Sequence, residues 1–135
     1  MEAVVALSYK FFKDYSIIIV KATEVLTFED LMGYIQWLAE NANNIGEHKT
    51  LFDASEITDI TVTEDDIKKL FEFEEQTKSF KIFAKKLAIV TRGEKESKIA
   101  TLYEGLSSRM MENTIVFYHK DLSLKWLGIP EKILI

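Results

Sequence analysis

The chain has 135 residues, 47% of them hydrophobic and 29% charged, and a formal net charge of −5. This length predicts one domain, residues 1–135, that buries roughly two-thirds of its unfolded surface. The negative charge argues against nucleic acid as a partner, because phosphate contacts need a basic surface. The chain has no cysteine, which excludes disulfides, thiolate metal sites and a cysteine nucleophile.

Hydrophobic patterning gives no sign of a membrane or secretion segment. The longest uninterrupted aliphatic run, Ile17–Val20, is only long enough for a strand, whereas a membrane-spanning helix needs about 20 apolar residues. The first residues, Met1-Glu2-Ala3, lack the basic segment and small-residue cleavage site of a signal peptide. Together with the missing cysteines, these features favour the cytoplasm.

The first third of the chain predicts a hairpin followed by a helix. Apolar residues in 4–12 and 15–22 indicate two strands that turn through Lys13-Asp14. Thr27 is predicted to cap a helix, with Asp30 completing a capping box. The stop is expected near Gly46, which can adopt a left-handed conformation. The apolar side chains at helical spacing are Phe28, Leu31, Ile35, Leu38 and Ala42.

The rest of the chain alternates strands and helices. Predicted strands are 50–54, 86–91 and 114–118. The predicted helices are one that begins after Thr63, one over residues 95–112 and a short one over residues 122–127. Thr63 is predicted to cap the second helix with Asp66 at its third position. One side of that helix carries Ile67, Leu70, Phe71 and Glu74. The third helix has a stripe of Ile99, Leu102, Tyr103, Leu106 and Met110.

The resulting order, ββαβαβαβα, predicts a single α/β layer domain. Strands that alternate with helices pair mostly in parallel through right-handed crossovers. We therefore expect a five-stranded sheet that is mostly parallel, with the first strand antiparallel and the helices packed on the sheet.

Five short motifs, in this order along nearly the whole chain, resemble the SpoIIAA-like or STAS domains. More specifically, they resemble bacterial SpoIIAA-like proteins of unknown function, which are described as STAS/CRAL-TRIO-like. The motifs are Leu26-Thr27-x-Glu29-Asp30-Leu31, Leu51-Phe52-Asp53-Ala54-Ser55, Thr63-x-Asp65-Asp66-Ile67, Ala100-x-Leu102-Tyr103-Glu104-x-Leu106 and Trp126-Leu127-Gly128-Ile129-Pro130.

The resemblance implies a regulatory surface at Asp53, Ser55, Thr61 and Thr63. In anti-anti-sigma factors of this fold, Asp-x-Ser at a strand end precedes a phosphorylated Ser, and Thr63 falls at that position. Thr61-Val62-Thr63-Glu64 replaces the Asp-Ser-Ser-Gly of kinase-recognised members. The same residues also have local roles: a turn for Asp53 and Ser55, and a helix cap for Thr63.

Other polar residues favour ordinary structural roles. Acids at Asp59 and Glu64–Asp66 lack the spacing of a calcium loop. His48 and His119 have no nucleophile motif nearby, and Arg92–Lys95 reads as a plain turn. Lysines 78, 81, 85 and 86 suggest a mixed-charge surface.

The aromatic residues of the first two helices leave two interpretations open. Tyr34, Trp37, Phe73 and the nearby Met32 lie off the main apolar stripes. They belong either to a broad core or to an exposed face that binds a homodimer partner or an apolar ligand.

The function predicted from sequence is a non-enzymatic, STAS-like regulatory or protein-interaction domain. No motif indicates catalysis, a cofactor or a metal. The alternative is a small apolar-ligand or lipid-binding domain of CRAL-TRIO-like type, which requires an internal cavity of roughly a few hundred Å³.

Overall fold

The computed structural model describes residues 6–76, 84–108 and 112–134. Its elements follow in the order β1 (Leu7–Phe12), β2 (Ile17–Leu26), α1 (Phe28–Ile45), β3 (Lys49–Ile60), α2 (Glu64–Gln76), β4 (Lys86–Val90), α3 (Glu94–Ser107), β5 (Asn113–Phe117) and α4 (Lys120–Leu127). Short 3-10 turns lie at Lys13–Tyr15 and Glu131–Leu134. The predicted order of strands and helices is confirmed.

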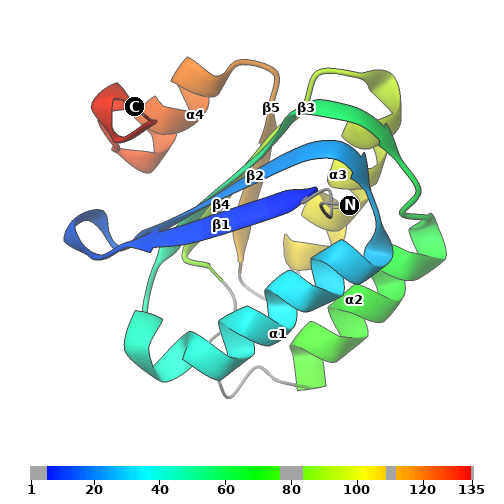
Figure 1. The fold of residues 1–135 in the computed structure, drawn as a ribbon, viewed down its shortest axis with the longest axis horizontal. Coiled ribbons are helices and arrows are strands. Elements are labelled where there is room, and N and C mark those ends of the chain that lie inside the picture. The colour runs from blue at the N-terminus through cyan, green and yellow to red at the C-terminus, as the bar shows by residue number, and fades with distance from the viewer. Residues whose placement is uncertain (1–5, 77–83, 109–111, 135) are drawn as a thin grey trace, which may run out of the picture.

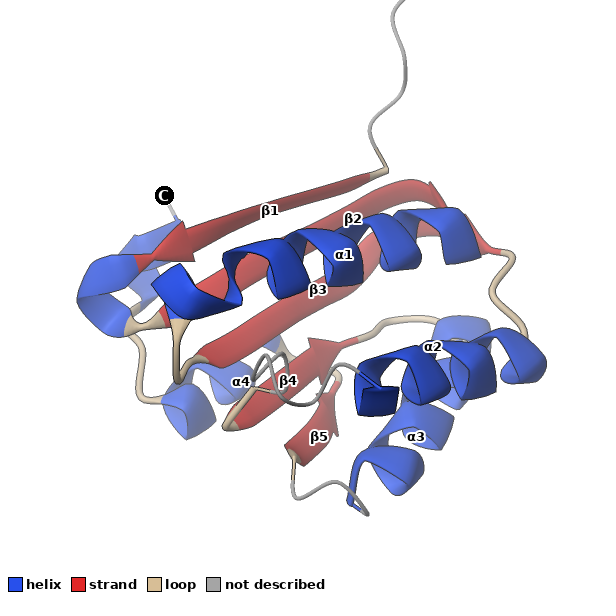
Figure 2. Cartoon of the chain, turned by 90° about the horizontal axis from the view of Figure 1, so that it is seen from below, coloured by secondary structure: helices blue, strands red, loops and turns tan. Residues whose placement is uncertain are grey.

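The sheet has the strand order β1-β2-β3-β4-β5 (Figure 1). β1 is antiparallel to β2, and every later pair is parallel, as the sequence predicted. Because each right-handed crossover steps one strand in the same direction, the three connecting helices fall on one face. Figure 2 shows α1, α2 and α3 on that face, with α4 behind the sheet.

The two faces of the sheet carry separate apolar cores. The larger core joins β1–β4 to α1, α2 and α3 through residues such as Val20, Leu38 and Leu70. The smaller core packs α4 on β3 and β4 through Leu51, Val90, Leu124 and Leu127, among others. Strand residues alternate between the two cores because successive side chains point to opposite faces.

Both predicted capping boxes are present. The backbone N–H of Asp30 donates to the Thr27 hydroxyl at 3.2 Å, and the Asp30 carboxylate accepts from the Thr27 backbone N–H at 3.1 Å. The corresponding bonds between Thr63 and Asp66 are 3.1 and 3.0 Å. Helix α1 ends at Ile45, and Gly46 follows with a φ of +64°. These local signals were read correctly because they act over three or four residues.

The main error concerns β3, which runs to Ile60 and does not stop at Ala54. Polar residues after Asp53 were read as a turn, but they continue pairing with β2, which itself extends to Leu26. β3 and β4 pair only as far as Asp53 and Val90. The second half of β3 therefore has a strand on one side only, where polar side chains are tolerated.

Smaller differences concern element ends. Helix α3 ends at Ser107, five residues before the predicted end. The predicted helix end at Glu112 is wrong, because Glu112 directly precedes β5. Helix α4 begins two residues earlier than expected, at Lys120. The predicted start of the first strand, residues 4 and 5, and Met110 of the third-helix stripe lie outside the described residues.

The aromatic residues of α1 and α2 pack into the larger core. Tyr34 is buried, and its ring lies 6.2 Å from that of Trp37, with Tyr9 of β1 contacting both. Phe73 packs against the same core. Of the two interpretations left open by the sequence, a broad core and an exposed binding face, the structure supports the broad core. No helix in the described ranges is long and apolar enough to cross a membrane.

Candidate functional site

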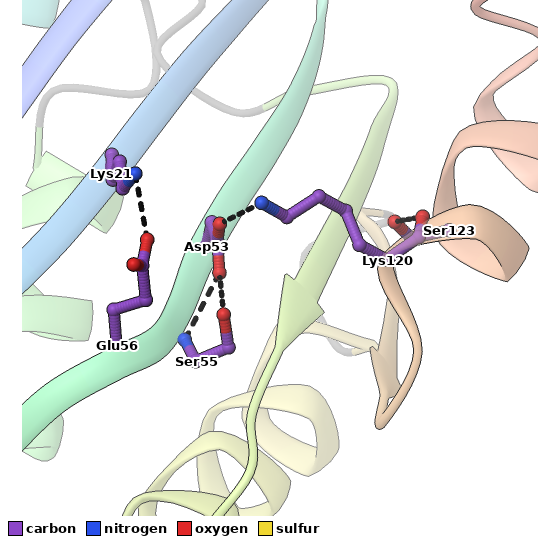
Figure 3. Close-up of polar contacts among 6 residues, drawn as sticks. All are labelled: Lys21, Asp53, Ser55, Glu56, Lys120 and Ser123. Atoms are coloured by element: carbon purple, nitrogen blue, oxygen red, sulfur yellow. Dashed lines mark hydrogen bonds and ion pairs between the residues drawn. The ribbon is translucent and has the colours of Figure 1, made fainter. Parts of the chain in front are cut away.

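Asp53 and Ser55 meet in the middle of β3 (Figure 3). The Asp53 carboxylate accepts from the Ser55 backbone N–H at 3.0 Å and from the Ser55 hydroxyl at 2.6 Å. The register advances from Lys21 opposite Asp53 to Thr23 opposite Glu56, so β3 holds one extra residue at this point. The local side-chain bonds predicted for Asp53 are present, but they stabilise a β-bulge and not a turn.

Asp53 also forms the buried end of an ion pair with helix α4. The Lys120 ammonium, at the first residue of α4, lies 2.6 Å from Asp53 Oδ2 (Figure 3). Burial by itself would raise the pKa of Asp53, and the bonds from Lys120 and Ser55 outweigh burial, so this pKa is lowered. The carboxylate is therefore ionised at neutral pH and engaged in holding α4.

Thr61 and Thr63 lie apart from Asp53, at the beginning of α2. Thr61 follows Asp53 by eight positions, which in extended chain corresponds to about 26 Å. Both threonines are exposed. The Thr61 backbone N–H donates to the Leu26 carbonyl at 3.0 Å, which places Thr61 beside the start of α1. The structure therefore divides the four predicted residues into two pairs, and it places the Thr63 hydroxyl in a helix cap.

A cavity of about 110 Å³ lies between the sheet and helices α1, α2 and α3. Most of its lining is aliphatic and comes from the larger core. Representative lining residues are Leu26, Ile35, Leu70, Leu87, Ile99 and Ala100. Sequence patterning predicted these positions as core and gave no sign that they enclose a space.

Polar side chains line the same cavity, among them Tyr34, Glu74, Tyr103 and Glu112. The Tyr103 hydroxyl lies 2.9 Å from Glu74 Oε2 and 2.9 Å from Glu112 Oε1. The other oxygen of Glu112 accepts from the Ala84 backbone N–H at 2.9 Å. Helix α2, helix α3 and the segment before β5 thus bring two carboxyl groups to one phenol.

Both carboxyl groups are almost completely buried, with exposures of 2% for Glu74 and 5% for Glu112. Burial raises the pKa of Glu74 well above its usual value, and the nearby Glu112 raises it further. Burial also raises the pKa of Glu112, to about 7, although bonds from Tyr103, Ala84 and Thr114 oppose the shift. Two like charges in a poorly solvated site cannot both ionise readily. Such perturbed groups in a cavity are typical of functional sites.

Among solved structures, the fold is similar to that of an uncharacterised DUF3478-family protein from Shewanella loihica, described as having a SpoIIAA-like fold. The two align with a TM-score of 0.59 and 21% sequence identity over 90% of this chain and 92% of that chain. The chain has a SpoIIAA-like fold. No protein-family model and no curated protein matches the sequence.

In this SpoIIAA-like domain, the N-terminus of α3 is capped by the side chain of Glu96 in the helix's own first turn. The Glu96 carboxylate accepts from the Gly93 backbone N–H at 3.0 Å. A Cβ at Gly93 would lie 2.5 Å from Glu96 Oε1, so a larger residue there would require the Glu96 carboxylate to move. The carboxylate occupies the place that a phosphate would take at a helix N-terminus. Arg92–Lys95 is therefore the plain strand-to-helix turn that the sequence predicted.

The histidines and lysines singled out in the sequence do not come together in one site of the SpoIIAA-like domain. His48 is buried and bonds to the Gly46 carbonyl, whereas His119 is exposed. Lys86 donates to the Trp126 carbonyl of α4, Lys85 is exposed, and lysines 78 and 81 lie outside the described residues. Within the described ranges, no group of three or more acidic or histidine side chains could hold a metal ion.

Sequence reasoning missed Tyr103 and Glu112 as polar residues of a site. The sequence pattern puts Glu74 on the buried side of α2. This position was the one signal of a polar site in the core, because unpaired glutamates are almost never fully buried. Glu112 gave no such signal, since it was assigned to the end of a helix.

Proposed function

We propose that this SpoIIAA-like domain binds one compact, mainly apolar small molecule in the cavity between its sheet and helices α1–α3. The observation that supports this most is the cavity itself, apolar over most of its lining and polar where Tyr103 meets Glu74 and Glu112. Apolar walls with a few converging polar groups are typical of small-molecule sites. The proposal assigns no reaction to the domain.

The volume narrows the class of ligand. Typical ligand pockets measure roughly 300–1,000 Å³, and the cavity here measures about 110 Å³. An engineered apolar cavity of about 150 Å³ binds benzene. We therefore propose a ligand about the size of benzene, not the lipid chain of the sequence-based alternative.

Benzene itself is a suitable probe for this proposal. Methyl NMR spectra of the isotope-labelled protein should shift at lining residues such as Leu70 and Ile99 as benzene is added. Ala100→Leu adds three carbons at the cavity wall and should weaken benzene binding at least about tenfold, since it removes the space. Thr101→Leu makes a similar change at the next, exposed position of α3 and should leave binding unchanged. No saturable shift in the wild-type protein would refute the proposal.

Protein interaction through the start of α2 is a second candidate function. The exposure of both Thr61 and Thr63 supports it, because each hydroxyl is reachable by a partner or a kinase. Thr63→Asn keeps a good helix cap and removes the hydroxyl, whereas Thr63→Ala removes both. Loss of partner capture or phosphorylation in both variants would support this function. Full retention in Thr63→Asn would exclude Thr63 as the phosphoacceptor.

A further inference from the structure

The outer edge of β1 carries backbone groups that do not take part in the sheet. The Thr23 backbone N–H donates to the Ala6 carbonyl at 2.8 Å, in a register that places Leu7 opposite Ala22. Because hydrogen-bonded pairs alternate along an antiparallel ladder, every second residue from Ala6 onwards bonds to β2. The residues between them direct their N–H and C=O groups away from the sheet, namely Leu7, Tyr9 and Phe11. Within the described ranges, no backbone hydrogen bond reaches these outward groups.

The opposite edge of the sheet, β5, is protected by the domain itself. The Glu104 carboxylate of α3 accepts from the Val116 backbone N–H of β5 at 2.9 Å. On the other side of the sheet, Figure 2 shows β1 outside the area that α1 covers. An unprotected edge strand is a template for pairing with another chain. Among the described elements, β1 is therefore the edge at which a further strand can be added.

We propose that two copies of this domain associate through β1, with the two strands antiparallel and a two-fold axis at Tyr9. The outward residues are symmetric about Tyr9, so Tyr9 meets Tyr9 of the second copy, and Leu7 meets Phe11 of the second copy. Each hydrogen-bonded pair exchanges two bonds, which gives about six bonds in all. Every outward backbone group of Leu7, Tyr9 and Phe11 is then bonded. This surface is separate from the cavity, so the inference does not depend on the proposed ligand.

The side chains of β1 fit this pairing on both faces of the sheet. Leu7, Tyr9 and Phe11 belong to the larger core, so apolar side chains of the two copies adjoin across the axis. On the other face, Lys10 lies opposite Ser8 of the second copy and not opposite another lysine. β1 contains no acidic residue, although the whole chain has a net charge of −5. Two copies can therefore meet at this edge without like charges directly opposite each other.

The number of hydrogen bonds indicates how strong the association is. At one bond per 100–200 Å², about six bonds correspond to an interface of about 600–1,200 Å². Stable interfaces bury about 1,200–2,000 Å², so we expect a reversible dimer in the micromolar range. The joined sheet ends in β5 on both sides, where Glu104 already occupies the Val116 N–H. Association should therefore close at two copies.

The cysteine-free chain allows a direct test of the register. Ser8 and Lys10 of the second copy form a non-hydrogen-bonded pair with Cα atoms about 4.5 Å apart, within disulfide range. Identical positions of the two copies are about 8 Å apart, which is too far. Oxidising an equal mixture of Ser8→Cys and Lys10→Cys should therefore give a linked dimer, and neither variant alone should. Ser8→Cys mixed with Lys21→Cys, an exposed position on the same face of β2, is the control and should stay unlinked.

Sedimentation velocity between about 1 and 500 µM measures the association itself. Ser8→Lys places like charges opposite Lys10 at two symmetric positions and should weaken the dimer about tenfold. Adding Lys10→Glu makes both positions attractive and should restore it. Both side chains are exposed, and thermal unfolding verifies that the variants fold. Linkage in the Ser8→Cys and Lys10→Cys mixture alone, with the charge effect, would support the proposal. A monomer at every concentration, a dimer without this linkage, or a dimer that Ser8→Lys leaves unchanged would overturn it.

Discussion

Replacing Lys120 by Met should destabilise the domain more than replacing Asp53 by Asn, because the two partners of this ion pair differ in exposure. The Asp53 side chain is 4% exposed and the Lys120 side chain 37%. Without Lys120, a carboxylate stays buried with only its bonds from Ser55. Without the Asp53 charge, the lysine can turn toward water.

The expected magnitudes follow from this asymmetry. Removing one partner of a buried pair costs about 3–5 kcal/mol when the remaining charge stays buried. We expect about 3 kcal/mol for Lys120→Met, the lower end, because Ser55 still donates twice to Asp53. Asp53→Asn should cost about 1 kcal/mol, since its amide oxygen can still accept from Ser55.

Urea unfolding at pH 7 measures both values, and the double variant tests their coupling. Adding Asp53→Asn to Lys120→Met should recover part of the lost free energy of unfolding, because it removes the uncompensated charge. Lys125→Met, an exposed change on the same helix, should stay within about 0.5 kcal/mol of wild type. The reasoning is refuted if Asp53→Asn costs as much as Lys120→Met, or if the two effects simply add.

Three further predictions concern titration and capping. Burial lowers the pKa of His48, so below about pH 6.5 the unfolded chain binds a proton at this residue more readily than the folded protein does. Stability should therefore fall as the pH drops below about 6.5. In thermal unfolding, His48→Gln should lose less stability than the wild-type protein over this pH range. Burial raises the pKa of Glu112 to about 7. The protonated Glu112 therefore stabilises the folded state fully below about pH 4.5, and this stabilisation is lost as the pH rises to about 7. The wild-type protein should lose up to about 3 kcal/mol more unfolding free energy than Glu112→Gln between pH 5 and pH 8. Thr27→Ala should cost about 1 kcal/mol in urea unfolding, and Thr27→Ser, which keeps the cap, much less.

The alternation of elements was predictable because its signals are local. Thr27 and Thr63 cap their helices through residues three positions away, and Gly46 ends α1 through its own backbone conformation. The aliphatic run of β4 likewise indicated a strand between two others, since such a strand is buried on both faces. Each feature depends on a few neighbouring residues, so it can be read from the chain alone.

The end of β3 was not predictable in the same way. Residues 55–60 are polar enough to suggest a turn, yet they form a strand because β2 runs alongside and supplies hydrogen bonds. Pairing with a distant segment overrides local preference. Because β3 continues past Ala54, Asp53 lies in the middle of the strand and not at its end. There it faces α4 and forms an ion pair with Lys120.

The sequence by itself determined the order of strands and helices, their caps and the apolar sides that pack together. Only the tertiary structure decided that Glu74, Tyr103 and Glu112 meet in one cavity, since these residues come from α2, α3 and the segment before β5. Helix periodicity indicates which side of a helix is buried, but not which side chains from other elements face it. The raised pKa values of the two carboxyl groups arise from that packing, because it buries both groups and brings Glu112 close to Glu74.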